Sequence, residues 1–198
     1  MSAPFYLHYQ DDQYDVSWRH INGENLAQPL ELDADVLIIG SGAGGGVSAE
    51  MLSDAGFSVI IVEEGPLRTA KDFTMKEETA YADLYQEAAA RKTKDKAISI
   101  LQGRSVGGST TVNWTSSFRT PLLTREYWQS QFQTRGVTDK DLNPWFEHIE
   151  QRLGMSPWAM EPNANNACLR YGAEKLQWSW NVIARNVRGC ANLGYCGM

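Results

Sequence analysis

The fold is decided by Asp35-Val36-Leu37-Ile38-Ile39-Gly40-Ser41-Gly42-Ala43-Gly44-Gly45. Residues 34–39 are apolar, rich in β-branched side chains and followed by glycine, which predicts a short buried strand. Residues 58–62 form a second apolar run of the same kind. The span 35–63 has the length of one strand–helix–strand unit. The helix of this unit is predicted to end at Gly56. Its buried face is predicted to consist of Val47, Met51, Leu52 and Ala55.

The glycines of this stretch match the G-x-G-x-x-G pattern of dinucleotide-binding turns, and each has a steric role. Gly40 allows the tight turn after the strand, and Gly42 allows a pyrophosphate to approach the backbone. Gly45 allows the helix to pack close to the strand. The helix begins near Ala43, where free N–H groups and the helix dipole favour a diphosphate.

An acidic residue at the end of the second strand completes the pattern. Glu63 is predicted to accept hydrogen bonds from both hydroxyls of the adenosine ribose, which disfavours a ligand with a 2′-phosphate. Glu64 takes this role if the strand register differs by one residue. NAD and FAD both fit this unit, and the alternative is a glycine-rich turn that binds no ligand.

Composition excludes several classes of function. The chain has 198 residues, a formal net charge of −6 and no block of Lys and Arg, so nucleic acid is not an expected partner. No apolar run has the length of a membrane span, and residues 1–12 lack the features of a secretory signal. Three cysteines favour a reducing compartment, and a cytoplasmic location is expected.

Further elements are predicted outside this unit. Residues 1–33 show no clear period and are interpreted as an N-terminal arm. Residues 98–101 and 178–184 are predicted to be strands, the second because its apolar residues alternate. A helix is predicted to begin at Asn143, with Pro144 in its first position.

A second glycine-rich segment follows the predicted strand at 98–101: Gly103-Arg104-Ser105-Val106-Gly107-Gly108-Ser109-Thr110-Thr111-Val112-Asn113. The pair Gly107-Gly108 permits close backbone approach to a flat or anionic ligand. Ser109 adds a hydroxyl donor, and Asn113 offers both a donor and an acceptor. The alternative is an ordinary Gly-Gly turn followed by a Ser/Thr cap.

Together the two segments resemble the glucose–methanol–choline (GMC) family of FAD-dependent alcohol oxidoreductases. Residues 35–45 are similar to the opening motif of that family, and residues 61–66 to the end of its second strand. Residues 103–113 are similar to its first signature. Residues 113–121 and 188–197 resemble the long-chain fatty alcohol oxidase branch.

The resemblance implies an α/β fold: an incomplete, Rossmann-like FAD-binding domain with a mainly helical C-terminal segment. It divides the chain into an N-terminal arm (1–33), an FAD-binding core (34–123) and a helical extension that begins the substrate domain (124–198). The implied FAD-binding residues are Gly40, Gly42, Ala43, Gly45, Glu63, Gly103, Arg104, Gly107, Gly108, Ser109 and Asn113.

The resemblance also implies non-covalent FAD. Some members attach FAD to a His just before the residue that matches Asn113, and this chain has Val112 there. The family's catalytic His lies in a C-terminal part beyond the portion that this chain resembles, and the alcohol substrate binds there too. We therefore expect no activity of the chain alone, and the electron acceptor stays undefined.

No catalytic residue is assigned within the chain. The three histidines lie in the polar arm (His8, His20) or in the middle of a helix (His148). Cys190 and Cys196, with the distant Cys168, do not have the spacing of a zinc site, so no metal is expected. The alternatives are the nucleotide-binding domain of an NAD-dependent dehydrogenase and a non-catalytic cofactor-binding remnant.

Overall fold

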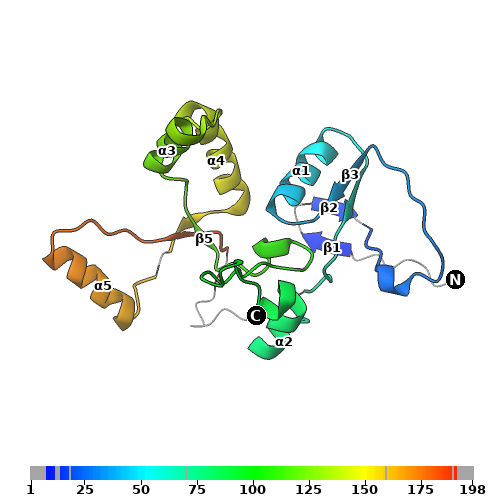
Figure 1. Ribbon diagram of the computed structural model, residues 1–198, viewed down its shortest axis with the longest axis horizontal. Helices are drawn as coiled ribbons and strands as arrows, with labels where there is room; N and C mark the ends of the chain where they lie inside the picture. The colour runs from blue at the N-terminus through cyan, green and yellow to red at the C-terminus, as the bar shows by residue number, and fades with distance from the viewer. Residues whose placement is uncertain are drawn as a thin grey trace.

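The computed structural model describes residues 8–11, 14–17, 19–69, 71–158, 160–188 and 190. Its central unit consists of β3 (Val36–Ile39), α1 (Ala43–Asp54) and β4 (Val59–Val62). The two strands are parallel, with Val36 opposite Val59, and α1 is the crossover between them (Figure 1). This confirms the strand–helix–strand prediction, including the helix end, where Gly56 has a φ of 91°.

The N-terminal arm contains regular structure that the sequence pattern did not predict. β1 (His8–Asp11) and β2 (Tyr14–Ser17) form an antiparallel hairpin, and a 3₁₀ turn, η1, spans Gly23–Asn25. The hairpin forms a two-stranded sheet of its own.

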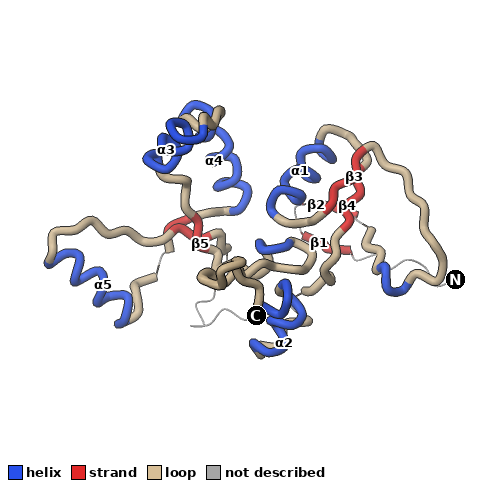
Figure 2. The backbone as a smooth tube through the Cα atoms, in the orientation of Figure 1, coloured by secondary structure: helices blue, strands red, loops and turns tan. Residues whose placement is uncertain are grey.

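The middle of the chain is mostly loop around one short helix (Figure 2). α2 (Glu77–Leu84) leads into a 3₁₀ turn, η2 (Gln86–Ala89), and a second turn, η3, spans Gly108–Thr110. The strand predicted at 98–101 is wrong, because the backbone there makes only an isolated bridge between Lys92 and Ser99. The buried apolar side chains of the described residues gather at the end of α2: Ala80, Leu84 and Tyr85.

The C-terminal segment consists mainly of helices. It contains α3 (Leu122–Phe132), α4 (Asp139–Leu153) and α5 (Ala164–Lys175). Three very short strands accompany them: β5 (Ser116–Ser117) before α3, β6 (Ser156–Pro157) between α4 and α5, and β7 (Ala184–Arg185) after α5. The strands form a small antiparallel sheet in the order β5-β7-β6. The strand predicted at 178–184 is therefore wrong, except for its last residue.

The start of α4 also differs from the prediction. Thr138 is the N-cap, and its side chain forms a capping box with Asp141. Asn143 and Pro144 lie inside the helix. The capping box satisfies two N–H groups that would otherwise lack partners, and this favours the earlier start.

Much apolar surface stays exposed. The accessible surface of the chain is 16217 Å², whereas a compact folded monomer of 22.2 kDa exposes about 9400 Å². The exposure includes the central sheet, where Leu37 is 61% and Ile39 is 85% exposed. In Figure 1, α3 and α5 lie away from the lobe of α1 and β3, and α4 meets α1 through an ion pair between Arg152 and Glu50 at 2.5 Å.

Within the described ranges, no helix is both long enough and apolar enough to cross a bilayer.

Candidate functional site

Two glycine-rich stretches that are far apart in the sequence lie against each other. We call residues 40–46 the first glycine segment and residues 103–113 the second. A Cβ atom added to Gly108 would lie 2.9 Å from the Cα atom of Gly42, so the two backbones are in direct contact. The Gly107 N–H donates a hydrogen bond of 2.9 Å to the hydroxyl oxygen of Ser41. The two predicted parts of the cofactor site therefore form one continuous surface.

The first glycine segment has the geometry that its pattern predicts. Gly40 has a φ of 92°, and its N–H donates a 2.8 Å hydrogen bond to the Val62 carbonyl. A Cβ atom on Gly45 would lie 2.0 Å from the Gly40 carbonyl oxygen, so any larger residue would push α1 away from the turn. Gly42 caps α1 without a side-chain hydrogen bond, and the first turn, which begins at Ala43, has no acidic residue. The helix thus presents N–H donors to an anion.

The acid at the end of β4 points back to the first glycine segment. One carboxylate oxygen of Glu63, Oε2, accepts from the Ser41 N–H (2.8 Å) and the Ser41 hydroxyl (2.7 Å), and Oε1 accepts from the Gly65 N–H (2.9 Å). Partial burial acts to raise the pKa of Glu63, but the hydrogen bonds from Ser41 and Gly65 outweigh it and lower the pKa. The ionised carboxylate is therefore the favoured form.

Glu64 faces a different set of groups. Its carboxylate pairs with the Arg104 guanidinium at 3.7 Å and accepts a hydrogen bond from the Gln86 side-chain amide. Of the two acidic residues considered from the sequence, Glu63 is the one that contacts the glycine turn.

A change in pH tests this role of Glu63. Because its folded-state pKa is lowered, Glu63 contributes stability above the ordinary pKa of 4.5, and this contribution is lost as the pH falls through the folded-state value. Other carboxylates with lowered pKa values, such as Asp35 and Asp141, add to the same trend. Glu63→Gln should therefore lower the urea midpoint at pH 7 and have a smaller effect at pH 3. Equal effects at the two pH values would contradict the assignment.

Tight backbone packing shapes the second glycine segment. Gly103 is buried, and a Cβ atom there would lie 2.5 Å from the Gly108 carbonyl oxygen. Its N–H donates to the Ser109 hydroxyl at 3.0 Å, and Gly107 has a φ of 91°. Gly65, just after β4, fits against this segment, because a Cβ atom on it would lie 2.4 Å from the Arg104 carbonyl carbon. The sequence motif included Gly65 but gave no reason for it.

The end of the second glycine segment makes local contacts. Asn113 is exposed, and its side-chain oxygen accepts a 2.8 Å hydrogen bond from the Thr115 N–H two residues further along. Val112 packs against the buried cluster at the end of α2. Neither position presents a nucleophile to a cofactor.

Ser105 is the fully buried polar side chain of the site region. Its hydroxyl oxygen is without a hydrogen-bond partner among the described residues. Ser105→Ala removes a buried hydroxyl that makes no hydrogen bond to the described residues. The free energy of unfolding should therefore stay unchanged or rise by up to about 1 kcal/mol. Ser109→Ala is the matched control. It removes the acceptor of the Gly103 N–H and should lower the free energy of unfolding by about 1 kcal/mol in denaturant titrations. Equal losses in the two variants would overturn this account.

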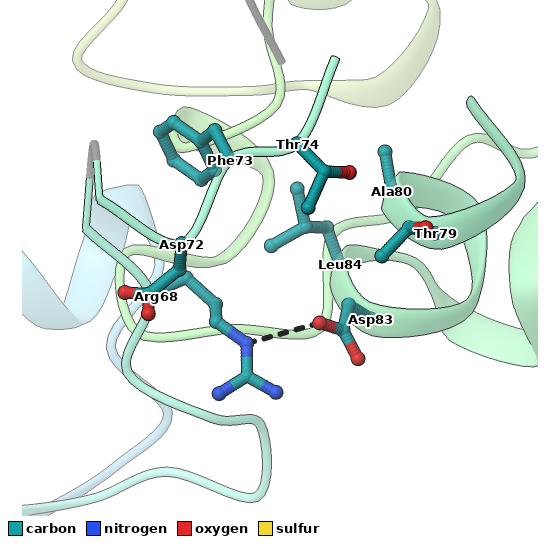
Figure 3. A pocket seen from close by; sticks show the side chains of 8 residues that line it. All are labelled: Arg68, Asp72, Phe73, Thr74, Thr79, Ala80, Asp83 and Leu84. Atoms are coloured by element: carbon teal, nitrogen blue, oxygen red, sulfur yellow. Dashed lines mark hydrogen bonds and ion pairs between the residues drawn. The ribbon is translucent and has the colours of Figure 1, made fainter. Parts of the chain in front are cut away.

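A hollow beside α2 is too small for a cofactor. Arg68 points across it to Asp83, with the Arg68 Nε atom 3.1 Å from the carboxylate (Figure 3). The hollow has room for about one water molecule. Its lining residues are Arg68, Asp72, Phe73, Thr74, Thr79, Ala80, Asp83 and Leu84.

None of the described histidines and cysteines belongs to either glycine segment. His148 is exposed on α4 and His20 is half-buried after the hairpin, while the side chain of His8 lies outside the described residues. Cys168 and Cys190 are exposed, and Cys196 lies outside the described residues. The described part of the chain contains no group of three or more His, Cys, Asp or Glu residues arranged to hold a metal ion.

Comparison with known proteins decides between families of dinucleotide-binding proteins. The sequence model of the GMC oxidoreductase family matches residues 81–198, which include the whole second glycine segment. The chain belongs to the GMC oxidoreductase family. Membership confirms the resemblance that the two glycine segments indicated.

Individual GMC relatives match nearly the whole chain. A long-chain-alcohol oxidase of Arabidopsis thaliana is 30% identical over 179 residues, which are 90% of this chain and 25% of the relative. A GMC-type oxidoreductase of Mycobacterium tuberculosis (strain H37Rv) is 34% identical over 174 residues, which are 86% of this chain and 28% of the relative. The chain thus spans about a quarter of the length of the curated relatives that it matches.

A solved structure shares the fold. Pyridoxine 4-oxidase from Mesorbium loti superposes with a TM-score of 0.57 at 18% sequence identity, over 79% of this chain and 37% of that chain. At this identity the match supports the mixed arrangement of helices and sheets.

Proposed function

We propose that this chain binds FAD non-covalently as the N-terminal, FAD-binding part of a GMC-type oxidoreductase that acts on the CH–OH group of alcohols. The observation that carries the proposal is the contact between the two glycine segments, with Gly107 hydrogen-bonded to Ser41 at 2.9 Å. In this proposal β3, α1 and β4 are the start of a Rossmann-like domain. The domain comprises residues 34–123, preceded by the arm (1–33) and followed by the start of the substrate domain (124–198).

The first glycine segment fits the adenosine and diphosphate portion of FAD. Gly42 leaves the backbone open, because a Cβ atom built on it meets no atom within 4 Å. The uncapped N-terminus of α1 points its N–H groups toward this open side, where a diphosphate is favoured. Glu63 is ionised beside the turn and would accept a hydrogen bond from a ribose hydroxyl. Gly40, Ala43 and Gly45 shape the turn rather than supply side-chain contacts.

The second glycine segment extends the site beyond the diphosphate, and this favours FAD over NAD. Gly103 and Ser109 hold the turn in shape, and Gly107 and Gly108 expose backbone next to Gly42. Arg104 fixes the segment to Glu64 through its guanidinium group. Asn113 offers an exposed amide at the far end of the segment, which would suit a polar group of the flavin portion of FAD. The nucleotide-binding domain of an NAD-dependent dehydrogenase does not need this second segment.

FAD, when bound, supplies the acceptor for a hydride from the alcohol carbon. Alcohol oxidation also needs a base for the hydroxyl proton. No described histidine lies at the glycine segments, so we assign the chain no catalytic residue and expect the base to come from polypeptide beyond these residues. By analogy with its relatives, the alcohol is aliphatic or long-chain. The chain's own residues bind and orient the cofactor.

Spectroscopy of the purified chain tests the proposal. After incubation with FAD and gel filtration, the protein fraction should carry flavin absorbance, and acid precipitation should release all the flavin to the supernatant. The same experiment with NAD should leave the protein fraction free of nucleotide. Retention of NAD but not FAD would indicate the dehydrogenase alternative, and flavin in the acid pellet would show a covalent link.

An alcohol-dependent reaction tests the absence of independent activity. The FAD-loaded chain, mixed with a long-chain primary alcohol under anaerobic conditions, should keep its oxidised flavin spectrum, because no described residue is assigned as the base. Bleaching of the flavin by the alcohol would contradict the assignment of no catalytic residue.

A further inference from the structure

Ser41 contacts both halves of the proposed site through one hydroxyl group. Its Oγ atom donates to Glu63 at 2.7 Å and accepts from the Gly107 N–H at 2.9 Å. Its own N–H also donates to the same Glu63 oxygen at 2.8 Å. Ser41 occupies a position that the G-x-G-x-x-G pattern leaves variable, so the pattern assigns it no role.

These contacts determine how much of Glu63 is open to a ligand. A carboxylate has about four acceptor positions, and Glu63 uses three of them for Ser41 and Gly65, with the Glu64 N–H also acting on it. The carboxylate therefore has room for at most one ribose hydroxyl, whereas the sequence predicted that Glu63 receives both. A carboxylate held by three donors does not need to reorganise when the ribose binds, which favours affinity.

The second contact fixes the distance between the two glycine segments. The Gly107 N–H has the Ser41 hydroxyl as its acceptor, and the neighbouring Gly108 touches Gly42. Without the hydroxyl, this half-buried N–H loses its acceptor, and the second segment loses a hydrogen bond to the first. One hydroxyl therefore couples the orientation of the ribose-binding acid to the position of the Gly107-Gly108 turn.

We propose that Ser41 is a positioning residue of the FAD site, which orients Glu63 toward the adenosine ribose and holds the second glycine segment against the first. This inference rests on the proposed function, because it assumes that the two segments bind FAD. It assigns to Ser41 a role in affinity rather than in the chemical step.

Flavin fluorescence titrations with FAD test the proposal on the full chain. Ser41→Ala should weaken FAD binding by about 10-fold, as expected for the loss of a hydrogen bond to a charged group. Ser41→Thr keeps the hydroxyl and should bind within about threefold of the wild type. Ser41→Cys keeps the size but replaces the hydroxyl with a weak donor, and it should resemble Ser41→Ala. Ser48→Ala, which removes an exposed hydroxyl from α1, is the matched control and should leave binding unchanged.

A double-mutant cycle separates positioning from a general structural role. If Ser41 acts through Glu63, the effect of Ser41→Ala on FAD binding should shrink to less than half, on a logarithmic scale, in a Glu63→Ala background. The residual effect reports the contact with Gly107. Full additivity of the two substitutions would overturn the proposal.

The other outcomes are equally distinct. Tighter binding by Ser41→Ala would show that the hydroxyl competes with the ribose for Glu63, and it would overturn the proposal. Equal FAD affinities of the wild type and Ser41→Ala would also overturn the role of Ser41, but they would leave the proposed FAD site intact. Failure of the wild-type chain to bind FAD would instead contradict the proposed function itself. If Ser41→Ala does not fold, as judged by circular dichroism, the FAD affinities of Ser41→Thr and Ser41→Cys test the proposal instead. Equal affinities of these two variants would overturn it.

Discussion

Gly45→Ala should lower the affinity of the chain for FAD by roughly 100-fold, equivalent to about 3 kcal/mol. The added Cβ atom would lie 2.0 Å from the Gly40 carbonyl oxygen and 3.3 Å from an Ile38 methyl group. A backbone carbonyl cannot rotate away as a flexible side chain can, so α1 must move relative to β3. The uncapped helix N-terminus and the turn at Gly42 then lose the arrangement that suits a diphosphate. Calorimetric titration with FAD measures the effect.

Gly46→Ala is the matched control, one residue further along the same helix. A Cβ atom at Gly46 meets no atom within 4 Å, and alanine is more favourable than glycine inside a helix by up to about 1 kcal/mol. This variant should bind FAD like the wild type and unfold at a higher denaturant concentration. If both variants bind FAD as well as the wild type does, the packing role of Gly45 is wrong.

Gly65→Ala should have the second largest effect and should act at the junction between β4 and the second glycine segment. Its Cβ atom would lie 2.4 Å from both the Arg104 carbonyl carbon and the Ser105 nitrogen. Because both are backbone atoms, the second segment must shift away from Glu63. We expect a loss of about 2 kcal/mol in the free energy of unfolding and at least a 10-fold loss in FAD affinity. Denaturant titration and FAD titration measure the two quantities.

Gly172→Ala controls for a general effect of replacing glycine. Gly172 lies in α5, away from the glycine segments, and a Cβ atom on it meets no atom within 4 Å. This variant should keep the FAD affinity of the wild type. Loss of FAD binding in Gly172→Ala as large as in Gly65→Ala would show that binding follows overall stability rather than the junction.

The strand–helix–strand unit was predictable because its signals are local and agree with one another. Residues 36–39 and 59–62 are apolar and β-branched, and glycines bound both ends of the helix. Close packing at the G-x-G-x-x-G turn restricts the residues that fit, as the contact between Gly45 and Gly40 shows. Where backbone atoms pack this closely, the sequence pattern of glycines follows directly from the steric limits.

Wrong predictions arose where two local signals compete or where a strand needs a distant partner. Asn143-Pro144 is a good helix start, but Thr138 with Asp141 is a better one, because its two reciprocal hydrogen bonds satisfy more N–H groups. Residues 178–184 alternate as a strand does, yet regular pairing is limited to Ala184 and Arg185. The partner strands β5 and β6 contribute only two residues each, and their length cannot be inferred from the alternation.

The candidate site was predictable in its parts but not in its assembly. The sequence identifies Glu63 and both glycine segments, but it contains no signal that Ser41 bonds to Gly107, 66 residues further along the chain. It also predicts contact of Asn113 with the cofactor, but it contains no signal that the Asn113 side-chain oxygen accepts a hydrogen bond from the Thr115 N–H. Side-chain partners between distant segments depend on the tertiary structure, which local patterns do not describe.

The central claim is that the two glycine segments together form a single FAD site. Calorimetric titration of the 198-residue chain with FAD, followed by titration with FAD in the presence of excess ADP, tests it most directly. We predict saturable, equimolar FAD binding that ADP weakens by competition, and weaker binding of ADP than of FAD because ADP does not reach the second segment. Absence of saturable FAD binding, or ADP binding as tight as that of FAD, would contradict the claim.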